Sequence, residues 1–181
     1  MTDYKFCPRC AAPLISRDSL NTGKDQIEIK TPLVCSTACG FIYYNNPVPI
    51  VAVVVEYNGD VLLAHNRAWE KPFYGVITGF VDHGEAPDEC AIREVKEELN
   101  LNTDAATLIG VYPSKPMNQV IIGYHVNAYG DIVLNEELDD FKLVPLEKCF
   151  APNVGTGFIL RDWLLSRGIE PTMLTITTQD S

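Results

Sequence analysis

The sequence predicts an α+β protein in which a mixed sheet lies between helices, with a small cysteine-rich unit in front of it. Two closely spaced cysteine pairs lie within the first 45 residues, and apolar, β-branched segments stand before and after one helical segment. A second helical segment closes the chain. Strands on both sides of a helix favour a sheet covered by helices. We therefore expect two domains, residues 1–45 and 46–181.

The first domain is defined by its cysteines, which are Cys7, Cys10, Cys35 and Cys39. Four thiolates in two close pairs suit a tetrahedral Zn²⁺ ion. No ligand position is left open for water, so we expect a structural zinc that supplies the folding energy of a segment too small for its own core. The chain between the pairs is long enough for a hairpin through residues 27–33. A rubredoxin-like iron site, or two disulfides in a secreted protein, are the alternatives.

The composition argues against two classes of protein. The formal net charge of −10 disfavours a protein that binds the nucleic-acid backbone. The longest apolar run, residues 48–55, is too short to span a membrane. The first ten residues lack the apolar segment of a signal peptide. Together with the paired cysteines, this leads us to expect a cytoplasmic protein without a membrane partner.

The second domain is expected to begin with a hairpin. Val48–Glu56 is a continuous apolar run, typical of a strand that is buried on both faces. Asn58-Gly59 is a strong hairpin-turn signal, so a returning strand is expected at Val61–His65. An aromatic-rich loop, Arg67–Val76, follows.

A central helix is expected from Pro87 to Leu99. Proline suits the first turn of a helix, and Asn100 can adopt the left-handed conformation that ends one. Apolar residues such as Ala91 and Val95 recur at helical spacing and are expected to face a core.

The rest of the chain contains four further segments of strand type and a second helix. The strands are expected at Thr107–Tyr112, Gln119–Tyr129, Asp131–Leu134 and Phe141–Val144. The closing helix is expected at Asn153–Arg167. The polar tail from Thr172 onwards is expected to be loose.

Three glutamates give the central helix an unusual face. Glu94, Glu97 and Glu98 lie three and four residues apart, so their like charges repel one another. They also occupy the second half of the helix, where the helix dipole disfavours anions. Arg93 is expected to offset one of them. An acidic solvated face is the alternative, but a bound hard cation explains the arrangement best, and oxygen ligands of this kind suit Mg²⁺.

The stretch from Gly79 to Leu101 resembles the Nudix box, a glycine and a later glutamate followed by an Arg-Glu-x-x-Glu-Glu run. The matching positions are Gly79, Glu85, Arg93, Glu94, Glu97 and Glu98. The family usually has glycine where Asn100 stands, and both residues tolerate the same backbone conformation. The resemblance implies an α/β/α Nudix sandwich that hydrolyses the diphosphate of a nucleoside diphosphate linked to a group X, with Mg²⁺ or Mn²⁺ as the cofactor.

The resemblance also implies roles for individual residues. Glu94 and Glu98 would be the principal metal ligands, and Glu97 would assist them or polarise the attacking water. The backbone carbonyl of Thr78 would complete a metal site, and Glu137 would be a distal ligand or the base, unless it is simply a surface glutamate. Glu85 and Arg93 are expected to pair and hold the loop that begins at Gly79 against the helix.

A cysteine-rich ribbon ahead of a Nudix box resembles the NADH pyrophosphatase branch of the family. Tyr43-Tyr44 and Gly79-Phe80-Val81 match that branch, which implies that Tyr44 and Phe80 are candidates for holding the base, with packing in the core as the alternative. The resemblance also implies a homodimer. One segment departs: the branch carries Ser-Gln-Pro-Trp-Pro-Phe-Pro where Ser114–Gln119 reads Ser-Lys-Pro-Met-Asn-Gln. Lys115 is a candidate for contacting a phosphate, with a merely solvated lysine as the alternative.

The altered segment leaves the identity of X open. NADH, FAD, ADP-ribose, a capped RNA end and a dinucleoside polyphosphate all remain possible substrates, and a capped end is the one nucleic acid that we expect. A catalytically silent Nudix-like module, whose ribbon docks a partner, is the competing hypothesis.

Overall fold

The computed structural model describes residues 4–16, 32–37, 39–69 and 73–175. The chain divides into two compact units, Met1–Pro47 and Val48–Ser181. The sequence places this boundary after residue 45. No helix in the described ranges is both long and apolar enough to cross a membrane.

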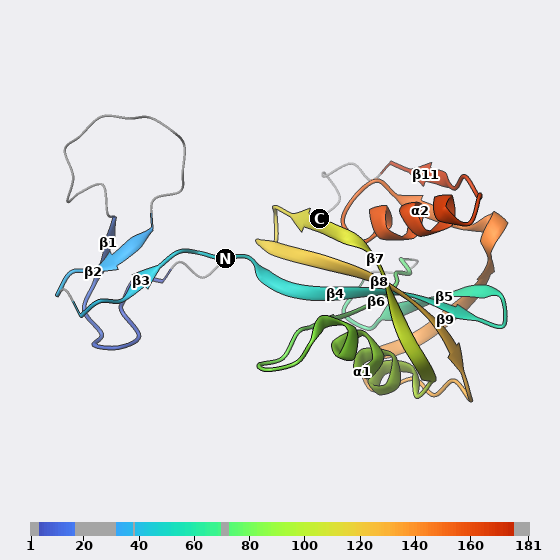
Figure 1. Cartoon of the computed structure of the whole chain (residues 1–181), viewed down its shortest axis with the longest axis horizontal. Helices are drawn as coiled ribbons and strands as arrows, with labels where there is room; N and C mark the ends of the chain where they lie inside the picture. Colours follow the sequence, from blue (N-terminus) through green and yellow to red (C-terminus); the bar gives the residue numbers. More distant parts are fainter. Residues whose placement is uncertain (1–3, 17–31, 38, 70–72, 176–181) are drawn as a thin grey trace. The chain divides into compact units, whose positions relative to one another are not determined.

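The first unit contains a small antiparallel sheet, drawn in blue and cyan in Figure 1. Its strands are β1 (Leu14–Ser16), β2 (Leu33–Cys35) and β3 (Ile42–Tyr43), in that order. Most of the hairpin predicted through residues 27–33 lies outside the described residues; β2 begins at its last residue.

The second unit is built on a six-stranded mixed sheet, as predicted. Its strands are β4 (Val48–Tyr57), β5 (Asp60–Asn66), β6 (Ile77–Phe80), β7 (Asn102–Ser114), β8 (Gln119–Tyr129) and β9 (Leu138–Pro145). The order is β7-β8-β4-β5-β9, and β6 pairs with β4. Strands β4 and β8 are parallel, and the other pairs are antiparallel.

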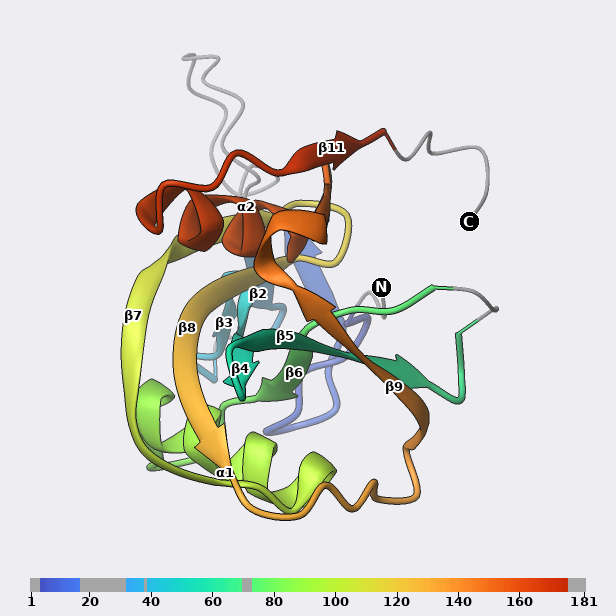
Figure 2. The ribbon, with the colours of Figure 1, turned by 90° about the vertical axis from the view of Figure 1, so that its right-hand side faces the viewer.

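Two helices cover opposite faces of this sheet (Figure 2). They are α1 (Pro87–Leu99) and α2 (Gly157–Ser166). Strand β4 lies between both layers, because Val51, Val53 and Val55 belong to the core that contains the buried face of α1. Ile50, Ala52 and Val54 alternate with them and belong to the core of α2. The continuous apolar run in β4 therefore fills two cores, as expected for a central strand.

One edge of β4 is shared by two strands. Residues Ile50–Val53 pair with β6, and residues Val55–Tyr57 pair with β5. The change of partner falls at Val54, so β5 and β6 diverge from this point. A single antiparallel β-bridge between Ala64 and Gly75 connects β5 with the segment that leads into β6. The sheet therefore opens between β5 and β6 on the side of α1.

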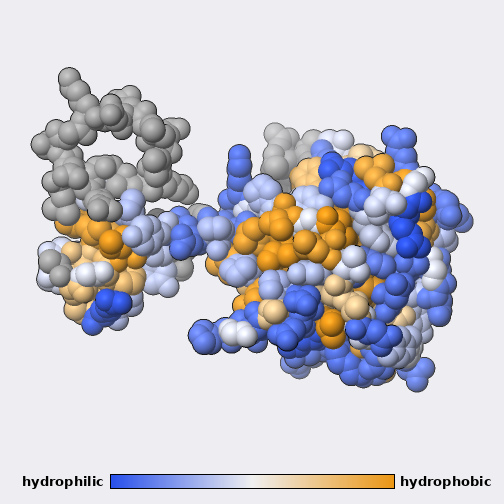
Figure 3. Space-filling view, viewed as in Figure 1, coloured by the Kyte–Doolittle hydropathy of each residue, from blue (hydrophilic) through white to orange (hydrophobic). Residues whose placement is uncertain are grey.

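Apolar surface remains on the second unit. Figure 3 shows it gathered over β7 and β8 on the face that is visible there. Strand β7 carries two large apolar residues that are more than half exposed, Leu108 and Val111.

Three predictions about elements were wrong. Asp131–Leu134 is not a strand: Val133 N–H donates to Leu99 O of α1 at 3.0 Å, so this segment satisfies the end of the helix instead of a neighbouring strand. The closing helix begins only at Gly157, because Asn153 N–H donates to Leu174 O.

The tail is also more ordered than the sequence indicates. Residues Thr172–Leu174 form β11, which pairs in parallel with β10 (Phe150–Pro152). A short 3₁₀ turn, η2 (Leu146–Lys148), stands before β10. Residues 176–181 lie outside the described part of the chain.

Candidate active site

A cavity of about 450 Å³ lies where β5 and β6 diverge. It is lined by Glu94 and Glu98 of α1 together with Glu137, which stands just before β9, and both Glu94 and Glu137 lie near enough to repel Glu98. Apolar and aromatic side chains line other parts of the same cavity, and they are Ile50, Trp69, Phe80 and Met117. The cavity thus combines a cluster of hard anionic oxygens with surfaces suited to a flat apolar group.

Glu98 is the most buried of these carboxylates. Only 7% of the residue is exposed, and no hydrogen-bond donor contacts its carboxylate among the residues that the structure describes. Burial, followed by repulsion from Glu94 and Glu137, raises the pKa of Glu98 to about 8. Burial also raises the pKa of Glu94. A buried carboxyl group that lacks a partner is costly for the fold.

Gly79 explains how Glu94 enters the cavity. The Glu94 carboxylate packs so closely on the Gly79 backbone that a Cβ at this position would overlap it. Gly79 lies in β6 opposite Val51 of β4, so the strand fixes the surface on which Glu94 rests. The glycine of the box is therefore required here by close approach.

Arg93 connects the box loop to the helix. Its Nε donates to Glu85 Oε1 at 2.7 Å, and this hydrogen bond is the main reason why the pKa of Glu85 falls to about 2. Its Nη1 lies 2.8 Å from Glu94 and 2.9 Å from Glu97. The sequence predicted that Arg93 would offset one glutamate of the helix; it pairs with two, and Glu98 is the one that it does not reach.

The structure brings some of the predicted site residues to the cavity and leaves others outside. Thr78, Gly79, Phe80, Arg93, Glu94, Glu98 and Glu137 line it. Glu85 and Glu97 do not, and the Glu97 side chain is 57% exposed. Lys115 lies in the exposed turn between β7 and β8 and does not line the cavity, although Met117 of this turn and Gln119 at the start of β8 do. Tyr44 belongs to the first unit, and its role stays a prediction.

Sequence reasoning missed several residues of the cavity. Trp69, Met117 and Gln119 line it, yet none was a candidate. Met117 and Gln119 lie in the segment that departs from the NADH pyrophosphatase pattern. This departure was the one feature of the sequence that could have marked them as site residues. Trp69 lies in a loop that was recognised only as rich in aromatic residues.

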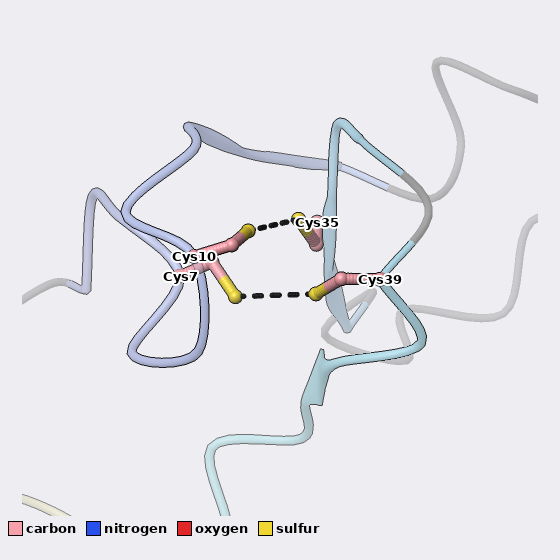
Figure 4. Close-up of side chains that lie close together, drawn as sticks. All are labelled: Cys7, Cys10, Cys35 and Cys39. Carbon is pink, nitrogen blue, oxygen red and sulfur yellow. Dashed lines mark hydrogen bonds between the residues drawn. The ribbon is translucent and has the colours of Figure 1, made fainter.

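The four cysteines of the first unit form a separate cluster (Figure 4). The Sγ atoms of Cys7 and Cys39 are 3.5 Å apart, those of Cys10 and Cys35 are 3.4 Å apart, and all four lie within 4.8 Å of one another. Sulfur atoms around a tetrahedral zinc lie roughly 3.8 Å apart, given the usual Zn–S bond. The cluster therefore fits a four-thiolate metal site.

Thr37 favours the thiolate forms of Cys10 and Cys35 within this cluster. Its hydroxyl lies 3.2 Å from Cys35 Sγ, and this hydrogen bond is the main reason why the pKa of Cys35 falls to about 6. Metal ligands must be deprotonated thiolates. Among the described residues, this is the one group of three or more ligand-type side chains already close enough to share an ion; the acidic side chains of the cavity lie further apart.

Comparison with known proteins decides the family. Residues 46–159 match the NUDIX domain model, which covers most of the chain. The chain belongs to the Nudix family. This confirms the predicted family and the predicted mixed α/β/α fold.

Relatives and solved structures agree with this Nudix assignment. A protein named NAD-capped RNA hydrolase NudC from Vibrio vulnificus (strain CMCP6) is 30% identical over 177 residues, which are 95% of this chain and 60% of that protein. The protein of the same name from Stutzerimonas stutzeri (strain A1501) is 26% identical over 142 residues, which are 77% of this chain and 48% of that protein. The chain thus spans only part of the length of these relatives.

A crystal structure of a NUDIX hydrolase from Nitrosomonas europaea superimposes on this Nudix protein with a TM-score of 0.71. The two sequences are 21% identical, and the match covers 96% of this chain and 100% of the other. At this identity the likeness supports the fold alone.

Proposed function

We propose that this Nudix protein is a metal-dependent pyrophosphohydrolase that cleaves the diphosphate of a nucleoside diphosphate linked to a group X. The observation that supports this most directly is that Glu94, Glu98 and Glu137 line one cavity. Glu94 and Glu137 lie near enough to repel the Glu98 carboxylate, which has no hydrogen-bond donor among the described residues. Such an arrangement is unfavourable unless a cation offsets the charge.

The residues present fit a hard divalent cation. Carboxylate oxygens suit Mg²⁺ or Mn²⁺, and these ions also take substrate phosphates as ligands. Glu94 and Glu98 would hold the ion, with the Thr78 carbonyl and Glu137 as further ligands. When bound, the ion supplies charge neutralisation at the phosphates and acidifies a water molecule.

The remaining residues orient the substrate and the ligands. Arg93 and Glu85 hold the loop after Gly79 against α1, which keeps Glu94 on the cavity wall. Glu137 or Glu98 would accept the proton of the attacking water. Glu97, which is exposed and paired with Arg93, would assist through its charge. A nucleophilic water placed by these groups is the usual basis of phosphoryl-transfer catalysis.

The apolar side chains supply a place for the nucleoside. Phe80 is 60% exposed, and Met117 is 66% exposed, although both line the cavity. Exposed aromatic and thioether groups beside a phosphate site suit stacking with a flat ring. NADH, FAD, ADP-ribose, a dinucleoside polyphosphate and an NAD-capped RNA end all offer such a ring next to a diphosphate, and the names of the relatives add weight to the last.

The other expectations from the sequence extend this proposal. We expect the four cysteines to hold a structural Zn²⁺, Tyr44 to contribute to the base site and Lys115 to contact a phosphate. We also expect a homodimer, which light scattering would measure, and a cytoplasmic location.

A substrate panel tests the proposal. The five compounds named above, and AMP as a compound that lacks a diphosphate, are incubated with the full chain, with Mg²⁺ or Mn²⁺, and the released mononucleotide or phosphate is measured. We expect turnover of at least one compound, and none without a divalent ion. Preference for a compound that lacks a diphosphate would overturn the reaction class. Absence of turnover throughout, together with a protein partner that binds through the cysteine unit, would favour the silent module.

A further inference from the structure

Strand β9 contains a single extra residue, two positions after Glu137. In the antiparallel pair of β5 and β9, His65 stands opposite Asp140, and Asn66 stands opposite Leu138. Asp139 is therefore a β-bulge residue, because it has no position of its own opposite β5. An extra residue in one strand moves every side chain before it to the other face of the sheet, and bulges next to functional sites commonly redirect a side chain.

The bulge determines on which face of the sheet the side chains before Asp139 lie. Leu138 is 4% exposed and packs in the core of α1, and Glu137 lines the cavity beside Glu94 and Glu98. With regular pairing, Leu138 would lie opposite Arg67 and on the opposite face of the sheet. The position of Glu137 therefore depends on the bulge.

His65 holds this bulge from the neighbouring strand. Its Nδ1 lies 2.6 Å from Asp139 Oδ1, and the residue is only 1% exposed. Because the carboxylate accepts the Nδ1 proton, Nε2 is the remaining polar atom of the ring, and it has no hydrogen-bond partner among the described residues. An apolar side chain would avoid this cost, so packing alone does not explain a histidine here.

The segment is held on its other side by α1. Asn135 N–H donates to Glu98 O at 3.1 Å, and the Asn135 side chain accepts from Glu137 N–H at 3.0 Å. Arg67 N–H donates to Glu137 O at 2.9 Å. The backbone of Glu137 is thus fixed between the helix that carries Glu98 and the end of β5, and the His65–Asp139 pair closes this arrangement.

We infer that His65 and Asp139 are positioning residues that lock the bulge and so direct the Glu137 carboxylate towards Glu94 and Glu98. The inference rests on the proposed function, in which Glu137 is a ligand or base. The pair does not touch the substrate; it acts through Glu137.

The test compares two aspartates that are adjacent in sequence. Asp139→Ala removes the acceptor of His65, whereas Asp140→Ala removes the acceptor of Tyr74, whose hydroxyl lies 2.6 Å from Asp140. Mn²⁺ binding to the substrate-free protein is titrated by electron paramagnetic resonance, and kcat and KM are measured separately. We expect Asp139→Ala to weaken Mn²⁺ binding and lower kcat by about tenfold each, as for other residues that orient metal ligands. KM should stay unchanged, and Asp140→Ala should bind Mn²⁺ like the wild type.

A second pair of variants, at His65, allows the inference to be tested even if Asp139→Ala does not fold. His65→Leu should reproduce its defects, and His65→Asn, whose amide can donate as Nδ1 does, should restore most of the binding. If Asp139→Ala and His65→Leu bind Mn²⁺ normally while Glu137→Gln does not, the inference is wrong and the proposed function stands. Equal losses in both aspartate variants would show a merely structural role and would also overturn it. Normal binding and turnover in Glu137→Gln and Glu98→Gln would overturn both proposals.

Discussion

Folding and binding make opposite demands on Glu98. The helix buries this side chain next to two other carboxylates, and no donor in the described residues offsets its charge. A sequence selected only for stability would place an uncharged residue here. The cost is understandable if the position is occupied by a cation during function.

The first prediction separates these two demands. In metal-free protein at pH 8.5, Glu98→Gln should raise the free energy of unfolding by about 0.5–2 kcal/mol, the usual range of a stabilising substitution. The same variant should lose at least about 99% of Mg²⁺-dependent turnover, because charge stabilisation by a metal ion is worth several kcal/mol. Chemical denaturation and an activity assay measure the two effects, with zinc content as the control. A variant that keeps full activity would contradict the metal assignment.

The second prediction concerns the close contact between Gly79 and Glu94. Gly79→Ala should lower the free energy of unfolding by about 1–3 kcal/mol, as expected for overpacking, and should impair turnover by displacing Glu94. In the double variant Gly79→Ala with Glu94→Ala, the overlap is removed, so most of the stability should return while activity does not. Additive losses of stability in the double variant would show that the two residues are not coupled.

At the scale of whole elements, α2 is held on the sheet partly by a buried histidine. His125 of β8 stacks on Trp163 of α2 with ring centroids 4.9 Å apart, and its Nε2 lies 3.0 Å from Glu56 Oε2. Arg167 reaches Glu56 from the end of the helix at 3.5 Å. Burial lowers the pKa of His125 in spite of the nearby carboxylate.

This gives a third prediction, on pH. Because the folded state has the lower pKa, the unfolded chain takes up the proton first. The contribution of His125 to stability is therefore fully present above the unfolded pKa of about 6.5 and is lost as the pH falls through the folded pKa. Between pH 7.5 and 5.0, the wild type should lose more stability than His125→Gln, by at most about 1.4 kcal/mol per pH unit. Thermal unfolding at several pH values measures this; parallel curves for the two proteins would contradict it.

The sequence predicted elements well where a repeating pattern was present. The run in β4, the Asn58-Gly59 turn and the helix from Pro87 to Leu99 all match the structure, because apolar periodicity and turn residues determine them locally. The segment Asp131–Leu134 was mispredicted because Val133 N–H donates to the Leu99 carbonyl of α1, a long-range contact that no local pattern contains. The late start of α2 has the same kind of cause.

In the candidate site too, local sequence patterns predicted some residues, whereas long-range contacts decided others. Spacing predicted that Glu94, Glu97 and Glu98 share one face of a helix, and Glu94 and Glu98 do line the cavity, whereas Glu97 does not. The contributions of Met117 and Trp69 depend on loops that reach the cavity from other strands, so spacing could not predict them. The bulge at Asp139 likewise appears only once β5 and β9 are paired.

At the scale of the whole molecule, the chain consists of two units with different sources of stability. The second has two cores around β4, whereas the described part of the first has only a small three-stranded sheet beside the cysteine cluster. The first unit ends at Pro47, and in a domain below about 70 residues a hydrophobic core rarely supplies enough stability without a metal or disulfides. We therefore expect the first unit to depend on its metal, and the second to be independent of it.

The fourth prediction follows from this difference. Cys35→Ser should remove about one equivalent of zinc, since a structural site needs all four of its ligands. It should leave the thermal unfolding of the second unit unchanged, whereas Cys90→Ser, outside the cluster, should retain the zinc. Atomic absorption and differential scanning calorimetry measure both effects. Loss of the main unfolding transition in Cys35→Ser would show that the two units are energetically coupled.

The change of partner along β4 has a consequence for how such a protein can diversify. The opening between β5 and β6 begins where β4 changes partner, so backbone pairing fixes where the cavity lies. Residues such as Trp69 and Met117 reach it from connecting segments, and connecting segments tolerate replacement far better than a sheet does. New substrate preferences can therefore arise from changes at a few rim positions, without any change in the glutamates of α1 that we propose as metal ligands.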